Sequence, residues 1–330
     1  MKTLYPVCFA TVYGLILRIV YGFLGDIVSI MGIGFLILAP VAIGFLTVFL
    51  WPKKYYLTPI AAFFVPSITS LVILLITILI EVEGAICWVM IFPFFAVAAG
   101  VGGLIARRYR KYVPEKAEFD FEKDETLKVS FVLFIPLFAG LIEGNRTSNR
   151  DDYTISRSIV IETPVSNVWH ELTHINDISA KEKKYSLATM LGFPKHLQTT
   201  LDSLCVGGKR KAVYEKGLYF DETIASFEKE KSLVLNIKTA PDKIPPTVMD
   251  EHVLIGGEHI DILQDKYILE PLSANSCRIT LSSHFYINTP INWYAGIWAR
   301  YMMKDMLQDE IELIKDRSIR DAGLHNATRN

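Results

Sequence analysis

Two hydrophobicity patterns divide the chain near Gly144: the first 142 residues are almost entirely apolar, and the remaining 188 are not. Four apolar runs, each with at most one charge, approach the ~20 residues that an α-helix needs to cross a bilayer. These runs are residues 5–24, 27–51, 57–80 and 84–106. The first is not a cleaved signal peptide, because more apolar runs follow it and no small-residue cleavage site ends it. We therefore expect an N-terminal transmembrane helical bundle of four to five helices over residues 1–143 and a second domain over residues 144–330.

A fifth apolar run decides on which side of the membrane the second domain lies. Residues 129–142 contain Pro136 and number only 14, which is in the ambiguous range for a span. Lys and Arg of short loops stay on the cytoplasmic side. Here they all fall at one end of the alternating spans, as Lys2, Lys53, Lys54 and the cluster at 107–111. We expect a bacterial inner membrane protein with a cytoplasmic N-terminus, and residues 129–142 to cross, so that the second domain is extracytoplasmic; if they lie in the interface instead, that domain is cytoplasmic.

The second domain has the pattern of an α+β fold, in which helices and antiparallel strands are segregated along the chain. Residues 156–162 predict a strand, and Thr163-Pro164 is a helix-start signal with proline at the first helical position. Strand-like runs separated by turn residues follow at 209–215, 218–228, 232–238, 259–263, 266–272 and 277–286. Thr289-Pro290 then begins a long helix that reaches about residue 317.

Alternation in the last strand predicts a sheet with one wet face and one dry face. Ile279, Leu281 and Phe285 share one side. The other side carries Arg278, Thr280, Ser282 and His284. The final helix is expected to cover the dry face, because apolar residues recur in it near the helical period. They are Ile291, Trp298, Met302, Met306 and Leu313, beside Trp293, Tyr294 and Tyr301. A curved antiparallel sheet around one aromatic helix favours an internal apolar cavity.

Composition and charge agree with an integral membrane protein that carries a globular domain. Hydrophobic residues make up 51% of the chain and charged residues 21%, and the mean hydropathy is +0.30. The formal net charge of -1, without a basic stripe of interleaved aromatics, excludes nucleic acid as a partner. Of four cysteines, only Cys205 and Cys277 lie in the second domain, and two do not fix a redox compartment.

Two features of the apolar half bear on its packing. A stripe of small residues in the fourth span favours close contact between helices; it consists of Ala96, Ala99, Gly100 and Gly103. Arg18 is the one charge inside a predicted span. Because a charge at the bilayer centre is costly, we expect Arg18 to reach outward to the interface or to pair with Asp26.

Four stretches of the second half resemble the START-like superfamily, called SRPBCC, which includes polyketide cyclases and lipid-transfer proteins. In chain order they are SIVIETPVSNVWHEL, GFPKHL, VGGKRKAVYEKGLYFDETIASFEKEKSLVLNIK and CRITLSSHFYINTPINWYAGIWARYMMKD. The resemblance covers residues 155–317, and EGAICWVM followed by a Gly-rich span is similar to a membrane-fused subgroup. It implies a helix-grip fold in which a curved antiparallel sheet surrounds a long C-terminal helix, with a hydrophobic ligand cavity and no universal catalytic residue.

One strand places a carboxylate among residues that are expected to face this cavity. Glu222 has the same parity as Phe220, and a buried carboxylate needs a cation or a raised pKa. If residues 216–217 form the turn, Tyr214 faces Phe220. Arg210 then lies diagonally from Glu222, either as a structural ion pair or for head-group recognition or acid–base chemistry. The expected ligand-binding residues are Arg210, Tyr214, Phe220, Glu222, Leu281, Phe285, Tyr294, Trp298 and Met302.

The stretch His170-Glu171-Leu172-Thr173-His174 fits the H-E-x-x-H pattern of zinc metallopeptidases, in which two histidines bind zinc and the glutamate activates water. The apolar residues around it define a buried face that puts both histidines on the solvent side: Val165, Val168, Trp169, Leu172 and Ile175. No third ligand is identifiable downstream. We expect a chance match without metal, and keep a zinc site of His170 and His174, with Glu171 as base, as the alternative.

The leading functional hypothesis is membrane-anchored binding of a lipid or other hydrophobic small molecule between the sheet and the final helix, without a cofactor and without catalytic residues. Burial of apolar groups supplies ~0.8 kcal/mol per methylene, which suffices for such binding. The alternative is an enzyme, either a cyclase or hydrolase that uses Glu222 and Arg210 or the zinc peptidase. A third hypothesis is a protein with a filled interior that senses or scaffolds an unidentified protein partner at the membrane.

Overall fold

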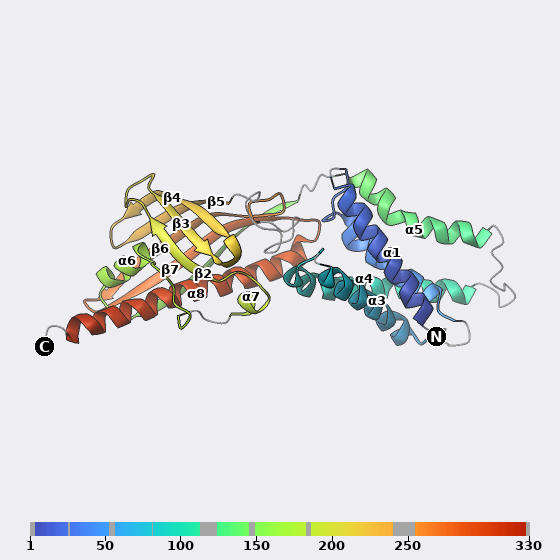
Figure 1. The fold of residues 1–330 in the computed structure, drawn as a ribbon, viewed down its shortest axis with the longest axis horizontal. Coiled ribbons are helices and arrows are strands. Elements are labelled where there is room, and N and C mark those ends of the chain that lie inside the picture. Colours follow the sequence, from blue (N-terminus) through green and yellow to red (C-terminus); the bar gives the residue numbers. More distant parts are fainter. Residues whose placement is uncertain are drawn as a thin grey trace. The chain divides into compact units, whose positions relative to one another are not determined.

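The chain forms two compact units, Met1–Ser148 and Asn149–Asn330, in the computed structural model (Figure 1). The structure describes residues 4–25, 27–52, 57–80, 82–112, 124–144, 149–182, 186–239 and 255–327. Within these ranges, only the backbone is described at residues 85–87, 111–112, 124–131 and 321–327.

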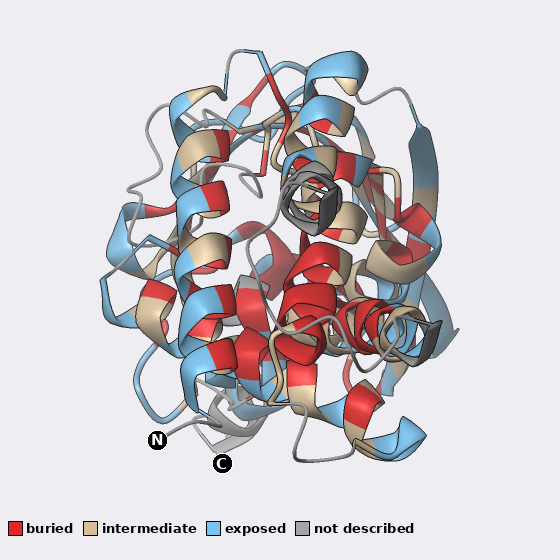
Figure 2. Ribbon diagram, turned by 90° about the vertical axis from the view of Figure 1, so that its right-hand side faces the viewer, coloured by how far each residue is buried: buried red, intermediate tan, exposed pale blue. Residues whose placement is uncertain are grey.

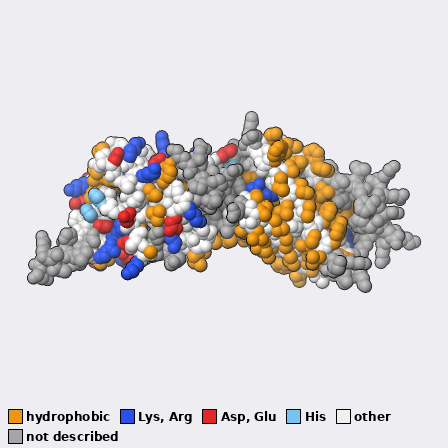
Figure 3. Space-filling view, viewed as in Figure 1, with side chains coloured by type: hydrophobic (Ala, Val, Ile, Leu, Met, Phe, Trp, Pro, Cys, Tyr) orange, Lys and Arg blue, Asp and Glu red, His pale blue; other side chains and the backbone are white. Residues whose placement is uncertain are grey.

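The N-terminal unit is helical. Its helices are α1 (Leu4–Phe23), α2 (Ala39–Phe49, directly after the π-helical segment Gly34–Leu38), α3 (Pro59–Leu79), α4 (Ala85–Tyr112) and α5 (Asp124–Glu143). Among the described residues, three helices are long and apolar enough to cross a membrane: Leu4–Phe23, Pro59–Leu79 and Trp88–Arg110. The unit also exposes apolar side chains over the face seen in Figure 3.

The second predicted span forms a shorter helix than expected, whereas α5 covers the whole fifth run, 129–142. Helical structure in the run 27–51 covers only Gly34–Phe49. The late start at Gly34 has a local cause. The Glu143 carboxylate accepts hydrogen bonds from the backbone N–H of Ile33 at 3.0 Å and of Gly34 at 3.3 Å. A carboxylate at a helix N-terminus satisfies free N–H groups and complements the helix dipole.

Small residues bring α2, α3 and α4 into backbone contact, as the stripe in the fourth span predicts. An added Cβ at Gly44 would lie 1.8 Å from the Ala99 carbonyl oxygen, and one at Gly103 would lie 2.1 Å from that of Ala62. Helix α2 is buried along almost its whole length, and Figure 2 shows a central helix that is buried all round while its neighbours are buried on one side. The N-terminal unit is therefore built around α2.

Arg18 pairs with Glu83, which lies between α3 and α4. Asp26, the partner considered from sequence, lies outside the described residues. The side chains of Arg18 and Glu83 are 15% and 7% exposed, so the pair offsets the cost of a charge within an apolar unit.

The second unit contains one antiparallel sheet in the order β1-β7-β6-β5-β4-β3-β2. Its strands are β1 (Arg150–Ile161), β2 (His196–Leu201), β3 (Lys209–Tyr214), β4 (Tyr219–Glu228), β5 (Ser232–Lys238), β6 (Ile260–Ser273) and β7 (Ser276–Asn288). Its helices are α6 (Val165–Thr173), α7 (Leu187–Met190) and α8 (Asn292–Ala327). Helix α8 runs along the sheet and packs mainly on β1 and β7 (Figure 1). The expected α+β fold, with an antiparallel sheet and a long C-terminal helix, is confirmed.

Several element boundaries differ from those expected. Strand β2 was not expected, and the runs 259–263 and 266–272 form one strand, β6. A register shift between Ile262 and Gln264 explains the second difference. An extra residue at such a β-bulge breaks the alternation in the sequence without ending the strand.

The wet and dry faces of β7 are confirmed. Of the residues expected on the buried face of the final helix, Ile291 and Leu313 are buried and the other three are not. Ile279, Leu281 and Phe285 are buried against the helix side of the sheet. On α8 the buried positions include Met303, Leu307, Ile311 and Ile314, whereas Trp298, Met302 and Met306 are only half-buried. Cys205 is exposed and Cys277 is buried, and both are free thiols.

Candidate ligand pocket and buried polar cluster

The turn between β3 and β4 sets the position of the buried charges. Residues Glu215–Gly217 form a 3₁₀ turn in which Lys216 has a φ of 58° and Gly217 a φ of 83°. Both values are left-handed, and glycine adopts this region without steric cost. The register pairs Ala212, rather than Tyr214, with Phe220. Arg210 consequently lies directly opposite Glu222, which corrects the expected diagonal placement.

Arg210 is the centre of a buried polar cluster. Its Nε lies 3.3 Å from Glu222 Oε2, and its Nη2 lies 3.6 Å from Glu310 Oε1 on α8. The Tyr267 hydroxyl donates to Glu310 Oε1 at 2.8 Å. Only 2% of the Arg210 side chain and 8% of the Glu222 side chain are exposed. Burial alone would lower the pKa of Arg210, but Glu222, Tyr267 and Glu310 raise it, so the guanidinium stays charged.

Carboxyl groups outnumber the single guanidinium of this cluster. Asp265 lies beside Ser283 on the same face of the sheet as Glu222. Burial raises the pKa of Asp265 to about 7, with Glu222 and Glu310 adding to the rise and the Ser283 hydrogen bond opposing it. Burial also raises the pKa of Glu222, against the effect of Arg210. The cluster therefore gains from an added proton or from a hydrogen-bond donor.

Several buried atoms of the cluster have no hydrogen-bond partner among the described residues. They are Arg210 Nε, Arg210 Nη1, Glu222 Oε2 and Asp265 Oδ1. The Arg210 Nε to Glu222 Oε2 approach is an ion pair without hydrogen-bond geometry. Unsatisfied buried polar groups are rare in proteins, and each costs ~1–3 kcal/mol.

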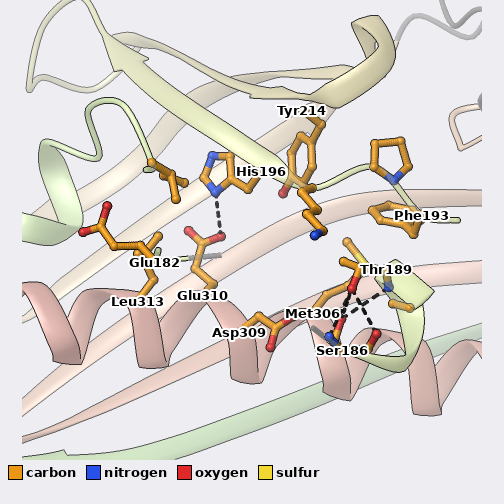
Figure 4. A pocket seen from close by; sticks show the side chains of 14 residues that line it. Glu182, Ser186, Thr189, Phe193, His196, Tyr214, Met306, Asp309, Glu310 and Leu313 are labelled. Carbon is orange, nitrogen blue, oxygen red and sulfur yellow. Dashed lines mark hydrogen bonds and ion pairs between the residues drawn. The ribbon is translucent and has the colours of Figure 1, made fainter. Parts of the chain in front are cut away.

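A pocket of about 80 Å³ lies between α7, the start of β2, β3 and α8 (Figure 4). Glu310 and Met306 line it from α8, and His196 and Tyr214 line it from β2 and β3. Figure 4 shows the Tyr214 hydroxyl end and Glu310 both directed into this space. Since Glu310 also contacts Arg210, it connects the pocket to the buried cluster.

His196 and Glu310 face each other in the pocket wall. His196 Nε2 lies 2.8 Å from the Thr199 hydroxyl oxygen and 3.2 Å from the Gln198 carbonyl oxygen. Burial lowers the pKa of His196 against the influence of Glu310, which favours the neutral ring. His196 Nδ1 lies 3.8 Å from Glu310 Oε2, too far for a direct hydrogen bond.

The structure distributes the sequence-predicted ligand residues over three places. Tyr214 lines the pocket and stacks on His196, with ring centroids 4.8 Å apart. Arg210 and Glu222 lie behind the pocket in the buried cluster. Phe220, Leu281 and Phe285 belong to the hydrophobic core, and Tyr294, Trp298 and Met302 are half-buried on α8 outside the pocket lining.

Sequence analysis did not identify His196 and Glu310 as pocket residues. The only signal for Glu310 is its spacing of four residues from Met306, which places both on one side of α8. His196 begins a strand that the alternation does not predict, and so it carried no signal.

The HELTH stretch forms no metal centre with other described residues. His170 is exposed, and its ring stacks on that of His174 with centroids 4.8 Å apart. The Glu171 carboxylate is buried and contacts His170 Nδ1 at 3.1 Å. Helix α6 ends at Thr173, so His174 lies just beyond its last turn. No group of three or more His, Cys, Asp or Glu among the described residues is arranged to hold a metal ion.

No protein-family model and no curated protein matches this sequence. Among solved structures, a norcoclaurine synthase point mutant from Thalictrum flavum in complex with a transition state analogue is 13% identical over 53% of this chain and 99% of its own, with a TM-score of 0.33. A START superfamily protein from Mycobacterium smegmatis is 9% identical over 51% and 97%, with a TM-score of 0.34. The Zhui aromatase/cyclase from Streptomyces sp. R1128 is 10% identical over 52% and 96%, with a TM-score of 0.33. At these identities and TM-scores, the likeness gives no information about function.

The second unit has the element order expected from the four sequence stretches: one strand, two short helices, six further strands of the same antiparallel sheet and a long C-terminal helix.

Proposed function

We propose that this protein is a membrane-anchored binding protein that takes a small amphipathic molecule into the pocket beside α8. The polar end of the guest lies against Glu310, His196 and Tyr214. The N-terminal unit is the anchor, which is supported by its three helices of spanning length among the described residues.

The observation that carries the proposal is the polar cluster at the inner wall of an open pocket. Glu310 faces the pocket and also contacts Arg210, while atoms of Arg210, Glu222 and Asp265 lack partners among the described residues. Binding sites combine an apolar lining with a few convergent polar groups. Phe193, Met306 and Leu313 supply the apolar part of this lining.

The size of the pocket constrains how a guest enters. About 80 Å³ holds only a few atoms, whereas drug-sized ligands occupy ~300–1,000 Å³. The wall opposite the sheet includes α7, a helix of four residues that is bonded to α8 through Ala188 N–H and Asp305 Oδ2 at 3.0 Å. Binding of a larger guest therefore requires α7 to move away from α8.

Native mass spectrometry of the full chain, extracted from its membrane without detergent exchange, tests this proposal. We expect a bound molecule in the natural protein and its loss in Met306→Trp, which fills the pocket. Met302→Trp is the matched control, since Met302 lies one turn earlier on α8 and outside the pocket lining. Retention of the guest by Met306→Trp contradicts the proposed site, and loss from Met302→Trp alone supports the region first expected from the sequence.

A second candidate function is acid–base catalysis in the same pocket. It is favoured by the 3.8 Å approach of His196 Nδ1 to Glu310 Oε2 in the pocket wall. Arg210 and Glu222, on which the sequence places this chemistry, would act through Glu310. Conversion of the co-purified molecule by the natural protein, lost in Glu310→Gln, supports an enzyme. Recovery of that molecule unchanged contradicts one.

A further inference from the structure

Helix α8 exposes one continuous stripe over its first thirteen residues, Asn292 to Lys304. The exposed residues in this segment are Trp293, Ile297, Arg300, Tyr301 and Lys304. The last four lie four, seven, eight and eleven residues after Trp293, which places all five on one side of the helix. Trp293, Ile297 and Tyr301 are 68%, 54% and 48% exposed. We call these five residues the α8 stripe.

The opposite side of the same segment faces the sheet. Asn292, Gly296 and Met303 are buried, and an added Cβ at Gly296 would lie 2.6 Å from the Tyr153 hydroxyl oxygen. Because this side of α8 is packed on the sheet, the helix cannot turn to bury the stripe in the core. Its large aromatic and aliphatic side chains face outward while α8 stays fixed on the sheet.

The chemistry of the stripe matches a lipid surface. Trp and Tyr prefer the interface between hydrocarbon and water, and basic residues bind anionic headgroups. Residues 292–304 contain Arg300 and Lys304 and no acidic residue; the first is Asp305. A helix face that combines Trp, Tyr and Ile with Arg and Lys is typical of helices that lie at a membrane surface.

The chain enters the second unit beside the start of the α8 stripe. Asn149 N–H donates to Asn288 Oδ1 at 3.0 Å, and the Asn149 carbonyl accepts a hydrogen bond from Asn292 at the start of α8. The entry of the chain into the second unit is thus bonded to the first turn of α8. Trp293 follows directly.

We propose that the α8 stripe docks on the anionic surface of the bilayer in which the N-terminal unit is anchored. This inference rests on the proposed anchoring but not on the ligand pocket. Trp293, Ile297 and Tyr301 enter the headgroup region, and Arg300 and Lys304 contact lipid phosphates. The docking would fix the first third of α8 at the membrane.

Hydroxyl-radical labelling of Trp293 and Tyr301 tests this proposal in the full chain, reconstituted in nanodiscs of phosphatidylcholine alone or mixed with phosphatidylglycerol. We expect lower labelling of both residues in the anionic nanodiscs. The variant Arg300→Gln with Lys304→Gln should restore labelling, since each basic residue near an anionic surface contributes about fivefold to the docking equilibrium. The control Lys229→Gln with Lys231→Gln removes two exposed charges from the β4–β5 turn and should leave the protection unchanged.

Two results would overturn the inference. The first excludes docking alone, and the second excludes both docking and the membrane anchor. Labelling that is equal in the two lipids, whether high or low, excludes docking while leaving the anchor intact. Release of the full chain from membranes by alkaline carbonate excludes the anchor itself, and docking with it.

Discussion

Two neighbouring ion pairs of β3 and β4 are expected to differ in how much they stabilise the fold, because one is buried and the other is exposed. Arg210 and Glu222 face the interior, whereas Lys211 and Asp221, the next pair in register, face solvent 4.0 Å apart. Removal of one partner from a buried pair leaves an uncompensated charge, and removal from an exposed pair leaves one in water. The two pairs therefore form an internal comparison.

We predict that Arg210→Met lowers the free energy of unfolding by about 3–5 kcal/mol, because Glu222, Asp265 and Glu310 lose their cation. Lys211→Met should change it by less than about 1 kcal/mol. The double variant Arg210→Met with Glu222→Met should recover part of the loss. Chemical denaturation, followed by hydrogen exchange of β3 and β4 amides in the full chain, measures each value. Equal effects of the two single variants would show that the cluster is not desolvated.

Glu182 gives the second unit a stabilising contribution that depends on pH. Its carboxylate binds Arg317 through Oε1 and Oε2 at 3.0 and 3.2 Å. Burial would raise the pKa of Glu182, but hydrogen bonds from Arg317 and Ser179 lower it to about 2. A lowered pKa stabilises the folded state above the ordinary carboxyl pKa, and this contribution disappears as the pH falls toward about 2.

We predict that Glu182→Gln destabilises the second unit by about 1–2 kcal/mol near neutral pH, since solvent screens part of the interaction, and by progressively less below about pH 4.5. The measurement is the difference in free energy of unfolding between the natural protein and the variant along a pH series. A difference that stays constant into the acid range would show that the Glu182 charge plays no part.

Asp265 also makes the stability of the second unit depend on pH, but its pKa is raised where that of Glu182 is lowered. Because its pKa is raised to about 7, the folded state stays protonated there while the unfolded chain ionises. Its stabilising contribution is complete below the unfolded pKa and is lost as the pH rises through about 7. We predict that Asp265→Asn is more stable than the natural protein above that pH and gains nothing near about pH 4. A gain that is independent of pH would contradict the buried, protonated carboxyl.

At the scale of elements, glycine contacts fix the arrangement of α2 in the N-terminal unit. Gly44 meets the Ala99 carbonyl, which has no freedom to move without shifting α4. We predict that Gly44→Ala lowers the thermal stability of the detergent-solubilised chain, although alanine favours helices by ~1 kcal/mol. Gly25→Ala, whose nearest backbone atom is 3.4 Å from the added Cβ, is the control. Equal melting temperatures would show that α2 and α4 are not in close contact.

The sequence predicted the elements that show a clear local pattern of apolar and polar residues. Strand β7 alternates cleanly and was placed with its correct faces, and the two longest apolar helices were found from composition. Strand β2 was not, since its pairing with β3 rather than its own alternation makes it a strand. The buried face of α8 was displaced for a related reason: Trp293 and Tyr301 are apolar and exposed, while Arg317 is charged and buried through its contacts with Glu182.

The candidate site was less predictable than the fold. Glu222 and Arg210 were identified because strand parity places both on the inner face. Their exact opposition depends on the left-handed Lys216, a conformation that only the folded turn dictates. Glu310 joins them from a helix almost ninety residues later in the chain, and no local pattern encodes that contact.

At the scale of the whole molecule, the chain combines an apolar helical unit with an α+β unit whose pocket is connected through Glu310 to a buried, acid-rich cluster. Under the proposed function, the apolar unit anchors the protein, so that the guest comes from in or near the bilayer. A polar group of the guest then bonds to Glu310 in the pocket wall.

The most direct test is an experimental density map of the full chain, isolated from its native membrane in lipid nanodiscs. The account predicts a guest beside Met306 with a polar group within hydrogen-bond distance of Glu310 or His196, and α7 displaced from α8. A map in which α7 stays on α8, and the side chains of Tyr214, His196 and Glu310 close on one another with no guest between them, would contradict it.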